Sequence, residues 1–410
     1  MTNSKKYSWV VVGLLWGVAL LNYMDRQILS TMKPALQVDI VELQTATNFG
    51  YLMAIFLWIY GFMSPLSGMI ADRTNRKWLI VVSLFVWSGV TFFMGYATTF
   101  NELYWLRAIM GVSEALYIPA GLSLIADYHD SKTRSLAIGI HMTGLYMGQA
   151  LGGFGATIAA EYSWQQTFHF FGIIGIIYAL VLIFFLKEKR AQLPQASIDN
   201  QKRPSLFKGL AFLFSNISFW VILFYFAIPS LPGWGIKNWL PTLFATNLNI
   251  EMSLAGPLST ITIAVSSLLG VVFGGILSDN WVQKNVRGRI YTSAIGLALT
   301  IPALLLIGFG HSLLNVIGAA FCFGFGYGMF DANNMPIICQ FVPSKFRATA
   351  YGLMNMTGVF AGAMVTNWLG KSTDKGSLGQ DFALLAGIVL IAVIVQLTIL
   401  KPKVGDFIES

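Results

Sequence analysis

Charged residues are scarce in this chain and make up only 11% of its 410 residues. Soluble domains carry about 25% charged residues, so a chain with so few does not cover a water-facing surface of ordinary size. Hydrophobic residues reach 56% and the mean hydropathy is +0.66. We therefore expect an all-α membrane protein.

Cysteine is also rare, with Cys322 and Cys339 alone. Their number and spacing give neither a disulfide framework nor a metal site. A nucleophile–base motif, a phosphate-binding loop and a metal cluster are likewise missing from the sequence. We expect no enzyme, no metal and no cofactor. The net charge of +8 would suit nucleic acid, but the basic residues belong to loops between apolar stretches, so no nucleic-acid partner is expected.

The sequence is rich in long apolar stretches. A transmembrane helix needs about 20 apolar residues, and such windows predict twelve spans. The first of them is a retained helix rather than a cleaved signal peptide, because no small-residue cleavage site follows it. The predicted spans are 8–30, 49–71, 78–97, 102–125, 135–158, 166–187, 217–244, 253–277, 290–309, 313–336, 348–370 and 382–400.

Lysine and arginine are distributed unequally between the two sets of loops. The set that includes both termini carries 20 of them and the opposite set carries three. Because basic loops stay on the cytoplasmic side, we expect both termini in the cytoplasm and the chain in the plasma (inner) membrane.

A polar segment divides the spans into two groups of six. It contains "KEKRAQLPQASIDNQKRPS", and we predict an N-terminal half at 1–190, a cytoplasmic linker at 191–216 and a C-terminal half at 217–410. The halves repeat, since "SKTRSLAIG" (131–139) returns as "SKFRATAYG" (344–352). Parallel six-span repeats are typical of transporters that bind substrate between the halves near the membrane midplane.

Several motifs resemble those of a known family. "GMIADRTNRK" (68–77), with a weaker copy "GILSDNWVQKNVRGR" (275–289), resembles the signature between the second and third helices of the major facilitator superfamily. Four further segments resemble its anion–cation symporter branch, which includes hexuronate and galactonate permeases and sialin-like transporters. They are "NYMDRQILS", "FLWIYGFMSPLSGMIADR", "LRAIMGVSEALYIPAG" and "IKNWLPTLF".

The resemblance implies proton-driven import of an organic anion, with a sugar acid such as a hexuronate, an aldonate or sialic acid as substrate. The expected partners are that anion, protons and the lipid bilayer, and the chain is expected to work as a monomer. Two alternatives remain open. A drug–proton antiporter of the same fold is disfavoured because Arg26 and Arg107 would repel lipophilic cations. A sugar-acid sensor is disfavoured by the short linker and tails.

Ionisable residues within the spans are the first site candidates, since such residues face a cavity or a partner. Asp25 and Arg26 are neighbours and point about 100° apart on a helix, so they need not pair with each other. The resemblance implies that Arg26 holds the substrate carboxylate and that Asp25 takes part in proton coupling. Alternatively, the helix ends here and both residues are interfacial.

Arg107 and Glu114 lie two turns apart on one face of the fourth span, separated by about 10 Å along the helix axis. The resemblance places Arg107 near the anion path and makes Glu114 a proton carrier; a static arginine–glutamate pair is the alternative. It also makes Tyr60 a substrate-binding residue, although a core tyrosine is equally compatible. Asn334 and Asn355 offer both donors and acceptors, which suit a hydroxyl-rich ligand.

The cytoplasmic loop signature predicts a gate formed by Gly68, Asp72, Arg73, Arg76 and Asp279. In this interpretation the acids latch the cytoplasmic side shut by pairing with basic loop residues. The alternative is that the basic residues only set the orientation.

Two packing features are also expected. Glycines at four-residue steps (Gly144, Gly148 and Gly152) predict close helix packing of the fifth span. The prolines and glycines of "PSLPGWGIKNWLP" (229–241) predict an interrupted seventh helix, where Lys237 would meet an entering anion. Asp331 is expected to make a contact between the halves.

Overall fold

The computed structural model describes residues 2–129, 133–189, 206–343 and 346–402; within these ranges the side chains of 2–5, 72, 73, 135, 206–209 and 348 lie outside the description. The first half contains α1 (Thr2–Thr31), α2 (Lys33–Asp39), the short 3-10 helix η1 (Val41–Gln44), α3 (Ala46–Arg73), α4 (Arg76–Met94), α5 (Phe100–Ala115), α6 (Tyr117–Tyr128), α7 (Arg134–Gly152), α8 (Gly155–Glu161) and α9 (Trp164–Phe185). The remainder contains α10 (Leu206–Phe214), α11 (Ile217–Leu248), α12 (Met252–Val282), α13 (Gly288–Phe309), α14 (Leu313–Asp331), α15 (Asn334–Phe341), α16 (Arg347–Asp374) and α17 (Leu378–Ile399).

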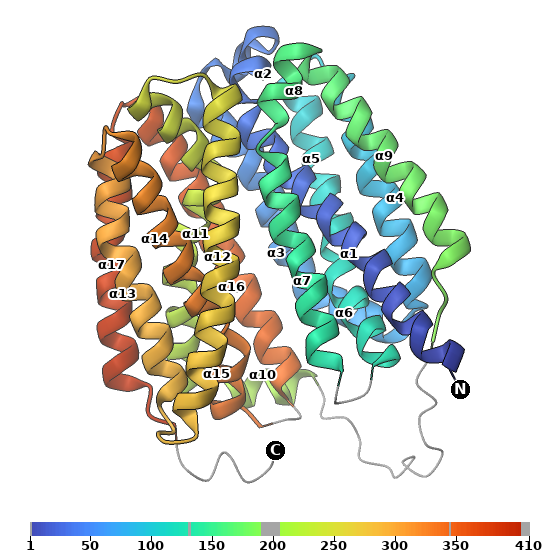
Figure 1. The fold of residues 1–410 in the computed structure, drawn as a ribbon, viewed down its shortest axis with the longest axis vertical. Coiled ribbons are helices and arrows are strands. Elements are labelled where there is room, and N and C mark those ends of the chain that lie inside the picture. The colour runs from blue at the N-terminus through green and yellow to red at the C-terminus, as the bar shows by residue number, and fades with distance from the viewer. Residues whose placement is uncertain (1, 130–132, 190–205, 344–345, 403–410) are drawn as a thin grey trace.

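These helices form twelve transmembrane spans in two six-helix halves, as the sequence predicts (Figure 1). In the first half α1 packs along α7 and α4 along α9, and in the second α14 packs against both α12 and α13. The fourth span of each half is broken, between α5 and α6 and again between α14 and α15. This matching break agrees with the internal repeat.

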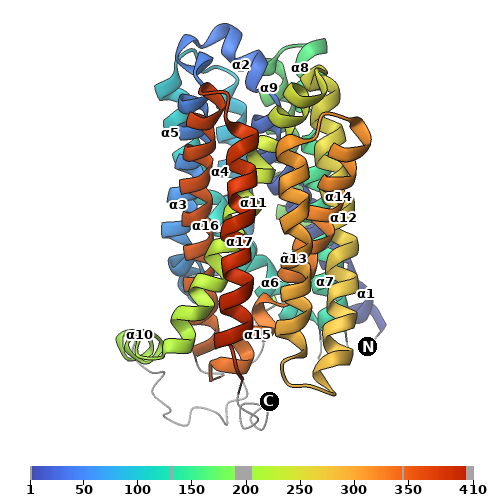
Figure 2. The same cartoon turned by 90° about the vertical axis from the view of Figure 1, so that its left-hand side faces the viewer.

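The boundary between the halves stays a prediction at 190 and 216, because 190–205 lie outside the described residues. The rest of the predicted polar linker is partly helical. Helix α10 lies there and contacts α11 and α16 (Figure 2), with the Phe212 ring stacked on that of Phe346 at 4.9 Å.

Local sequence explains where several helices begin. The Asn75 side chain accepts a hydrogen bond from the backbone of Trp78 and so caps α4. Thr99 and Glu102 form a reciprocal capping box at the start of α5. Each supplies an acceptor for backbone N–H groups that have no partner within the helix.

The seventh span is one continuous helix, so the predicted interruption is wrong. Helix α11 runs from Ile217 to Leu248 with Pro229, Pro232 and Pro241 inside it. Prolines are tolerated in transmembrane helices because neighbouring helices and small backbone adjustments satisfy the freed carbonyl groups.

Ten helical stretches in the described part of the chain are long and apolar enough to cross a membrane. The other two spans are α7 with α8, and α16, which carry more glycine and polar residues such as Gln149 and Asn355. Both pack against the opposite half, α7 on α12 and α16 on α3. These two interface helices are therefore less apolar than the other ten spans.

Glycine allows the closest of these helix contacts. A Cβ at Gly148 of α7 would overlap the carbonyl oxygen of Leu20 on α1, as the predicted small-residue packing requires. Similarly, a Cβ at Gly370 of α16 would lie 2.7 Å from the carbonyl oxygen of Ala46 on α3.

The two ends of the molecule differ. Helix α1 begins and α17 ends at one end, called here the termini end, whereas α2 and α8 lie at the other, called the α2–α8 end (Figure 1). Several hydrogen bonds join the halves toward the α2–α8 end. Thr157 Oγ1 donates to the carbonyl of Ser253 at 2.7 Å, and Thr260 Oγ1 donates to that of Ala150 at 3.1 Å.

Asp374 joins the halves at the α2–α8 end by capping a helix of the opposite half. Its carboxylate accepts from the backbone N–H of Ala46 at 2.7 Å, from that of Thr47 at 2.8 Å, and from Thr47 Oγ1 at 2.6 Å. Burial alone would raise the pKa of the Asp374 carboxyl, but these hydrogen bonds and the nearby charge of Lys33 hold it below its ordinary value. The carboxylate is thus charged at neutral pH, which favours its place at a helix N-terminus.

Lys33 lies beside this contact and reaches across to the second half. Its Nζ is 5.1 Å from the ring centre of Trp239 and 6.0 Å from that of Phe49, and the residue is 6% exposed. Burial lowers the pKa of Lys33 to about 8, against the opposing effect of Asp374. Closing the α2–α8 end therefore disfavours the charged form of this lysine.

Replacing Asp374 by alanine should loosen the α2–α8 end. An exposed helix cap contributes about 1 kcal/mol, so opening should become roughly five-fold more frequent. Hydrogen–deuterium exchange of a peptide covering 44–52 measures this. The control is Asp39→Ala, which removes hydrogen bonds to Trp164 and Gln165 within the first half. Equal acceleration in both variants would contradict a specific link between the halves.

The closure should also depend on pH through Lys33. Between about pH 8 and the ordinary lysine value of about 10.4, an open state holds a proton that the closed state lacks. Raising the pH in this range should therefore favour closure, while below pH 8 Lys33 is charged in both states and contributes no dependence. Spin labels at residues 42 and 375, in a background without native cysteines, would report the closed distance at pH 7 and pH 9.5. If the closed population still increased between pH 7 and pH 9.5 in Lys33→Met, Lys33 would not be the group that makes closure depend on pH.

Candidate functional site

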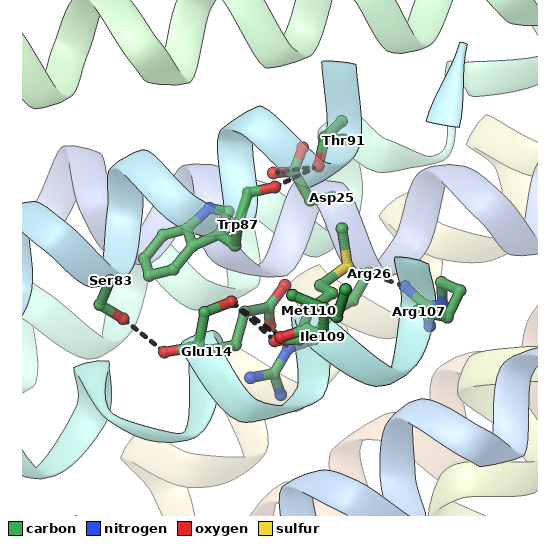
Figure 3. A network of polar contacts seen from close by, with 10 residues as sticks. Asp25, Arg26, Ser83, Trp87, Thr91, Arg107, Ile109, Met110 and Glu114 are labelled. Carbon is green, nitrogen blue, oxygen red and sulfur yellow. Dashed lines mark hydrogen bonds and ion pairs between the residues drawn. The ribbon is translucent and has the colours of Figure 1, made fainter. Parts of the chain in front are cut away.

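The two adjacent charges of α1 have different partners inside the first half (Figure 3). Arg26 Nε donates to Glu114 Oε2 on α5 at 2.5 Å. Asp25 points toward α4, where its carboxylate accepts a hydrogen bond of 3.4 Å from Thr91 Oγ1. Asp25 is 5% exposed and Glu114 is fully buried. Asp25 and Arg26 thus lie inside the bundle. Because α1 continues to Thr31, they do not mark an interfacial helix end.

Aromatic rings surround the Arg26 guanidinium. Its Cζ lies 4.9 Å from the ring centre of Tyr23, 5.0 Å from that of Phe56 and 4.7 Å from that of Tyr60. Rings at such distances stabilise a cation through their negative faces. Arg26 Nη2 has no hydrogen-bond partner among the described residues, so the guanidinium keeps a donor for another acceptor.

Arg107 packs against the ring of Phe56, as Arg26 does. The residue is 3% exposed, its Nη1 approaches Met110 Sδ at 3.1 Å, and its Cζ is 4.6 Å from the Phe56 ring centre. Within the described residues its Nε has no partner. The structure thus pairs Glu114 with Arg26 rather than with Arg107, its neighbour on the same helix face.

The four buried charges balance. Asp25 and Glu114 contribute two negative charges, and Arg26 and Arg107 contribute two positive ones. Burying one unpaired charge costs several kcal/mol, whereas a mutually compensated set is tolerated. The cluster is formally neutral, and any added charge would disturb that balance.

A cavity lies between the halves next to this cluster. It holds about 580 Å³ of space not filled by atoms, including its open side. Residues of α1, α7, α11, α12 and α14 line it: Tyr23, Met142, Leu145, Tyr146, Gln149, Gly233, Ile236, Lys237, Ile263, Ser267, Phe323, Tyr327, Gly328 and Asp331. Tyr23 belongs both to this wall and to the ring cage of Arg26, and so connects the cavity with the buried charges.

Lys237 and Asp331 are the charged residues of the cavity wall, both from the second half. Their charges attract each other. Lys237 Nζ is also 4.9 Å from the ring centre of Trp234 and 5.9 Å from that of Tyr23. Its backbone carbonyl accepts from Gln27 Nε2 at 3.0 Å, which ties α11 to α1. Asp331 accepts a hydrogen bond from Asn334 Nδ2 at 3.0 Å.

The two predicted amide ligands are engaged within the protein. Asn355 Nδ2 donates to Ser64 Oγ at 2.8 Å and thereby joins α16 to α3. Asn334 binds Asp331, and its Oδ1 accepts from Tyr225 Oη at 3.5 Å. Their role toward substrate stays a prediction, as do those of Tyr60 and Arg107.

The predicted gate residues lie at the termini end. The side chains of Asp72 and Arg73 are outside the description. Arg76 pairs with Asp127 at the end of α6, and Arg289 Nη2 contacts Asp279 Oδ1 at 3.2 Å. Each pair joins helices of one half. A Cβ at Gly68 would meet no atom within 4 Å. The latch between the halves stays a prediction.

Sequence reasoning overlooked several wall residues. Tyr23, Tyr146 and Tyr327 face the cavity together with Gln149. A signal existed for Tyr23, which precedes Arg26 by three residues and so shares its helix face. The other tyrosines lie in apolar stretches where a cavity residue and a core residue look alike.

Two six-helix halves around a central cavity with buried charges are the architecture of a membrane transporter. The family model described as Major Facilitator Superfamily matches residues 15–366. The chain therefore belongs to this superfamily, which confirms the resemblance.

Curated relatives and solved structures agree with this assignment. The hexuronate transporter of Bacillus subtilis is 25% identical, with 96% of this chain and 95% of the relative covered. The galacturonate transporter of Dickeya chrysanthemi is 26% identical, with 76% and 92% covered. A crystal structure of a bacterial homologue of the human lysosomal transporter Spinster shares the fold, with a TM-score of 0.81, 18% identity and 98% of both chains covered.

The Arg26–Glu114 pair should be far more important for stability than a surface pair. Removing one partner of a buried pair costs about 3–5 kcal/mol, so Arg26→Ala should lower the thermal midpoint in detergent strongly. Adding Glu114→Gln should restore much of the loss, because no unpaired charge then remains buried.

The matched control is the Arg289–Asp279 pair, whose Asp279 side chain is 71% exposed. The same double-mutant cycle there should give a coupling of about 1 kcal/mol or less. Equal coupling energies for the two pairs would show that burial does not set the strength of the inner one.

Proposed function

We propose that this protein imports an organic anion, a sugar acid, across the plasma membrane together with protons by alternating access. The observation that carries the proposal is the neutral, buried set of Asp25, Arg26, Arg107 and Glu114 beside the cavity. Two of its arginine nitrogens lack a partner among the described residues. The printed functions of the hexuronate and galacturonate relatives support the substrate class.

The charge balance gives a reason for coupling to protons. An anion that enters a formally neutral site adds one buried negative charge, which is costly in a low-dielectric interior. Protonation of Asp25 or Glu114 restores neutrality when the site closes. Uptake of anion and proton together therefore costs less than uptake of the anion alone.

Each residue has a role in this scheme. Arg26 receives the substrate carboxylate, since its free Nη2 can add a second hydrogen bond and charge-assisted bonds are strong. Tyr60 forms one wall of the guanidinium cage, and Arg107 adds positive potential nearby. When the carboxylate binds Arg26, it competes with Glu114, and Glu114 then takes up a proton more easily.

The state of the transporter in the alternating-access cycle is inferred from which of its two ends is closed. Hydrogen bonds between the halves close the α2–α8 end. Asp331, deep in the bundle, is nevertheless exposed, which agrees with a cavity that opens toward the termini end. With both termini in the cytoplasm, this arrangement corresponds to the inward-facing state from which substrate is released.

Uptake into liposomes tests the proposal. With an inward proton gradient, the purified protein should accumulate glucuronate, galacturonate, galactonate or sialate, and an uncoupler should abolish the accumulation. Arg26→Ala should reduce uptake at least about 100-fold because the carboxylate loses a charged partner. Glu114→Gln should retain exchange of substrate but lose gradient-driven accumulation.

Two exposed residues provide controls, Arg134→Ala for the arginine and Glu161→Gln for the glutamate, and both should transport normally. If lipophilic cations moved and no acid did, the antiporter alternative would replace this proposal. Binding of an acid without any transport would instead indicate a sensor.

A further inference from the structure

The cavity wall carries two opposite charges that are not part of the buried cluster of the first half. Lys237 and Asp331 both come from the second half, on α11 and α14, and both line the cavity. Arg26 is not among the residues that line the cavity, whereas Tyr23, whose ring packs against the Arg26 guanidinium, is one of them. That ring lies 4.9 Å from the Arg26 guanidinium and 5.9 Å from Lys237 Nζ, so one tyrosine separates the two cations. These two distances put Arg26 Cζ and Lys237 Nζ no more than 10.8 Å apart (4.9 Å plus 5.9 Å), so a six-carbon acid held at Arg26 can extend past the ring toward Lys237 and Asp331.

A ligand in the cavity can contact both Lys237 and Asp331. Asp331 is exposed although it lies deep in the bundle, and Lys237 is half-buried. Of the Asp331 carboxylate, Oδ1 accepts from Asn334 Nδ2. An ionised carboxylate has about four acceptor positions and an ammonium three donors. Both groups thus retain hydrogen-bonding capacity for a ligand.

The chemistry of the pair favours neutral hydroxyl groups over a second charge. The Asp331 charge is already compensated by Lys237, so a ligand ammonium would place two cations beside one carboxylate. A hydroxyl group adds no charge, donates to Asp331 and accepts from Lys237. Rings of Tyr23, Tyr146 and Tyr327 in the same wall suit the apolar face of a sugar.

We propose that Lys237 and Asp331 form a second subsite that binds the hydroxyl-bearing end of the anion whose carboxylate is held at Arg26. This inference rests on the proposed function and narrows its substrate class to polyhydroxylated acids, as against plain aliphatic acids. It assigns the two ends of one ligand to the two halves, the carboxylate to the first and the hydroxyl groups to the second.

A purely structural role of the pair makes a different prediction. An electrostatic attraction that only holds α11 near α14 would, when removed, weaken binding of all ligands alike or destabilise the fold. A hydroxyl subsite instead changes the preference between ligands. The decisive quantity is the ratio of the affinities for galactonate and for hexanoate, which have chains of equal length with and without hydroxyl groups.

Isothermal titration of the purified full-length chain with galactonate, hexanoate and glucosaminate measures this ratio. Wild type should prefer galactonate strongly. Asp331→Asn and Lys237→Gln should each lower galactonate affinity about 10-fold, the effect of one lost charge-assisted hydrogen bond, and leave hexanoate affinity nearly unchanged. Arg26→Ala should weaken the binding of both acids. Glu161→Gln and Lys375→Gln, at exposed positions, are the matched controls.

The double variant Lys237→Gln with Asp331→Asn leaves no unpaired charge and keeps the test valid if a single variant fails to fold. If wild type binds sugar acids but the affinity ratio is unchanged in all folded variants, the subsite is wrong while the proposed function stands. A preference of wild type for glucosaminate that Asp331→Asn removes would also overturn it, since Asp331 would then bind a cation. If wild type binds no hydroxylated acid, both proposals fail.

Discussion

The cost of a charge in a low-dielectric interior governs the centre of this protein. A carboxylate or guanidinium held there must have a counter-charge, strong hydrogen bonds or access to water. Arg26 and Glu114 satisfy each other, Arg107 compensates the remaining acid, and in the second half Lys237 compensates Asp331. The buried charges at the centre of each half are thus balanced within that half. This balance allows the charges to stay in the membrane, and in the proposed scheme it is the reason why the entry of an anion needs a proton.

The composition of the interface between the halves also follows from the cost of placing polar groups in lipid. Helices that face lipid must be apolar, whereas α7 and α16 face protein and can carry amides, hydroxyls and glycines. Their contacts include hydrogen bonds and close backbone approaches beside aromatic contacts such as those of Trp58 and Phe62 with Phe360. The clearest case is Asp374 at the end of α16, which caps the first turn of α3. Such a cap can dissociate and reform without disrupting either helix. Such an interface suits the alternating-access cycle proposed for the two halves.

Much of the fold could be predicted from the sequence, because a membrane span must be apolar over its whole length and an internal repeat reports the two halves. Ionisable residues within spans also stand out, so Asp25, Arg26, Arg107 and Glu114 were identified. Their pairing could not be predicted, since Arg26 and Glu114 are 88 positions apart and only the tertiary arrangement of the first half brings their side chains together. The continuity of α11 through its three prolines was not predicted either, because tolerance of proline in a membrane helix depends on the tertiary surroundings, which local sequence does not show.

The cavity wall was the least predictable part, and it bears directly on mechanism. A ligand that touches only one half stabilises no particular arrangement of the two, because its contacts move with that half. A ligand whose carboxylate lies at Arg26 and whose other end lies at Lys237 and Asp331 gains its full binding energy only when the halves enclose it. Differential affinity of this kind is what shifts a conformational equilibrium. Selectivity for hydroxylated acids and coupling of binding to closure then have the same origin, the division of the site between two halves.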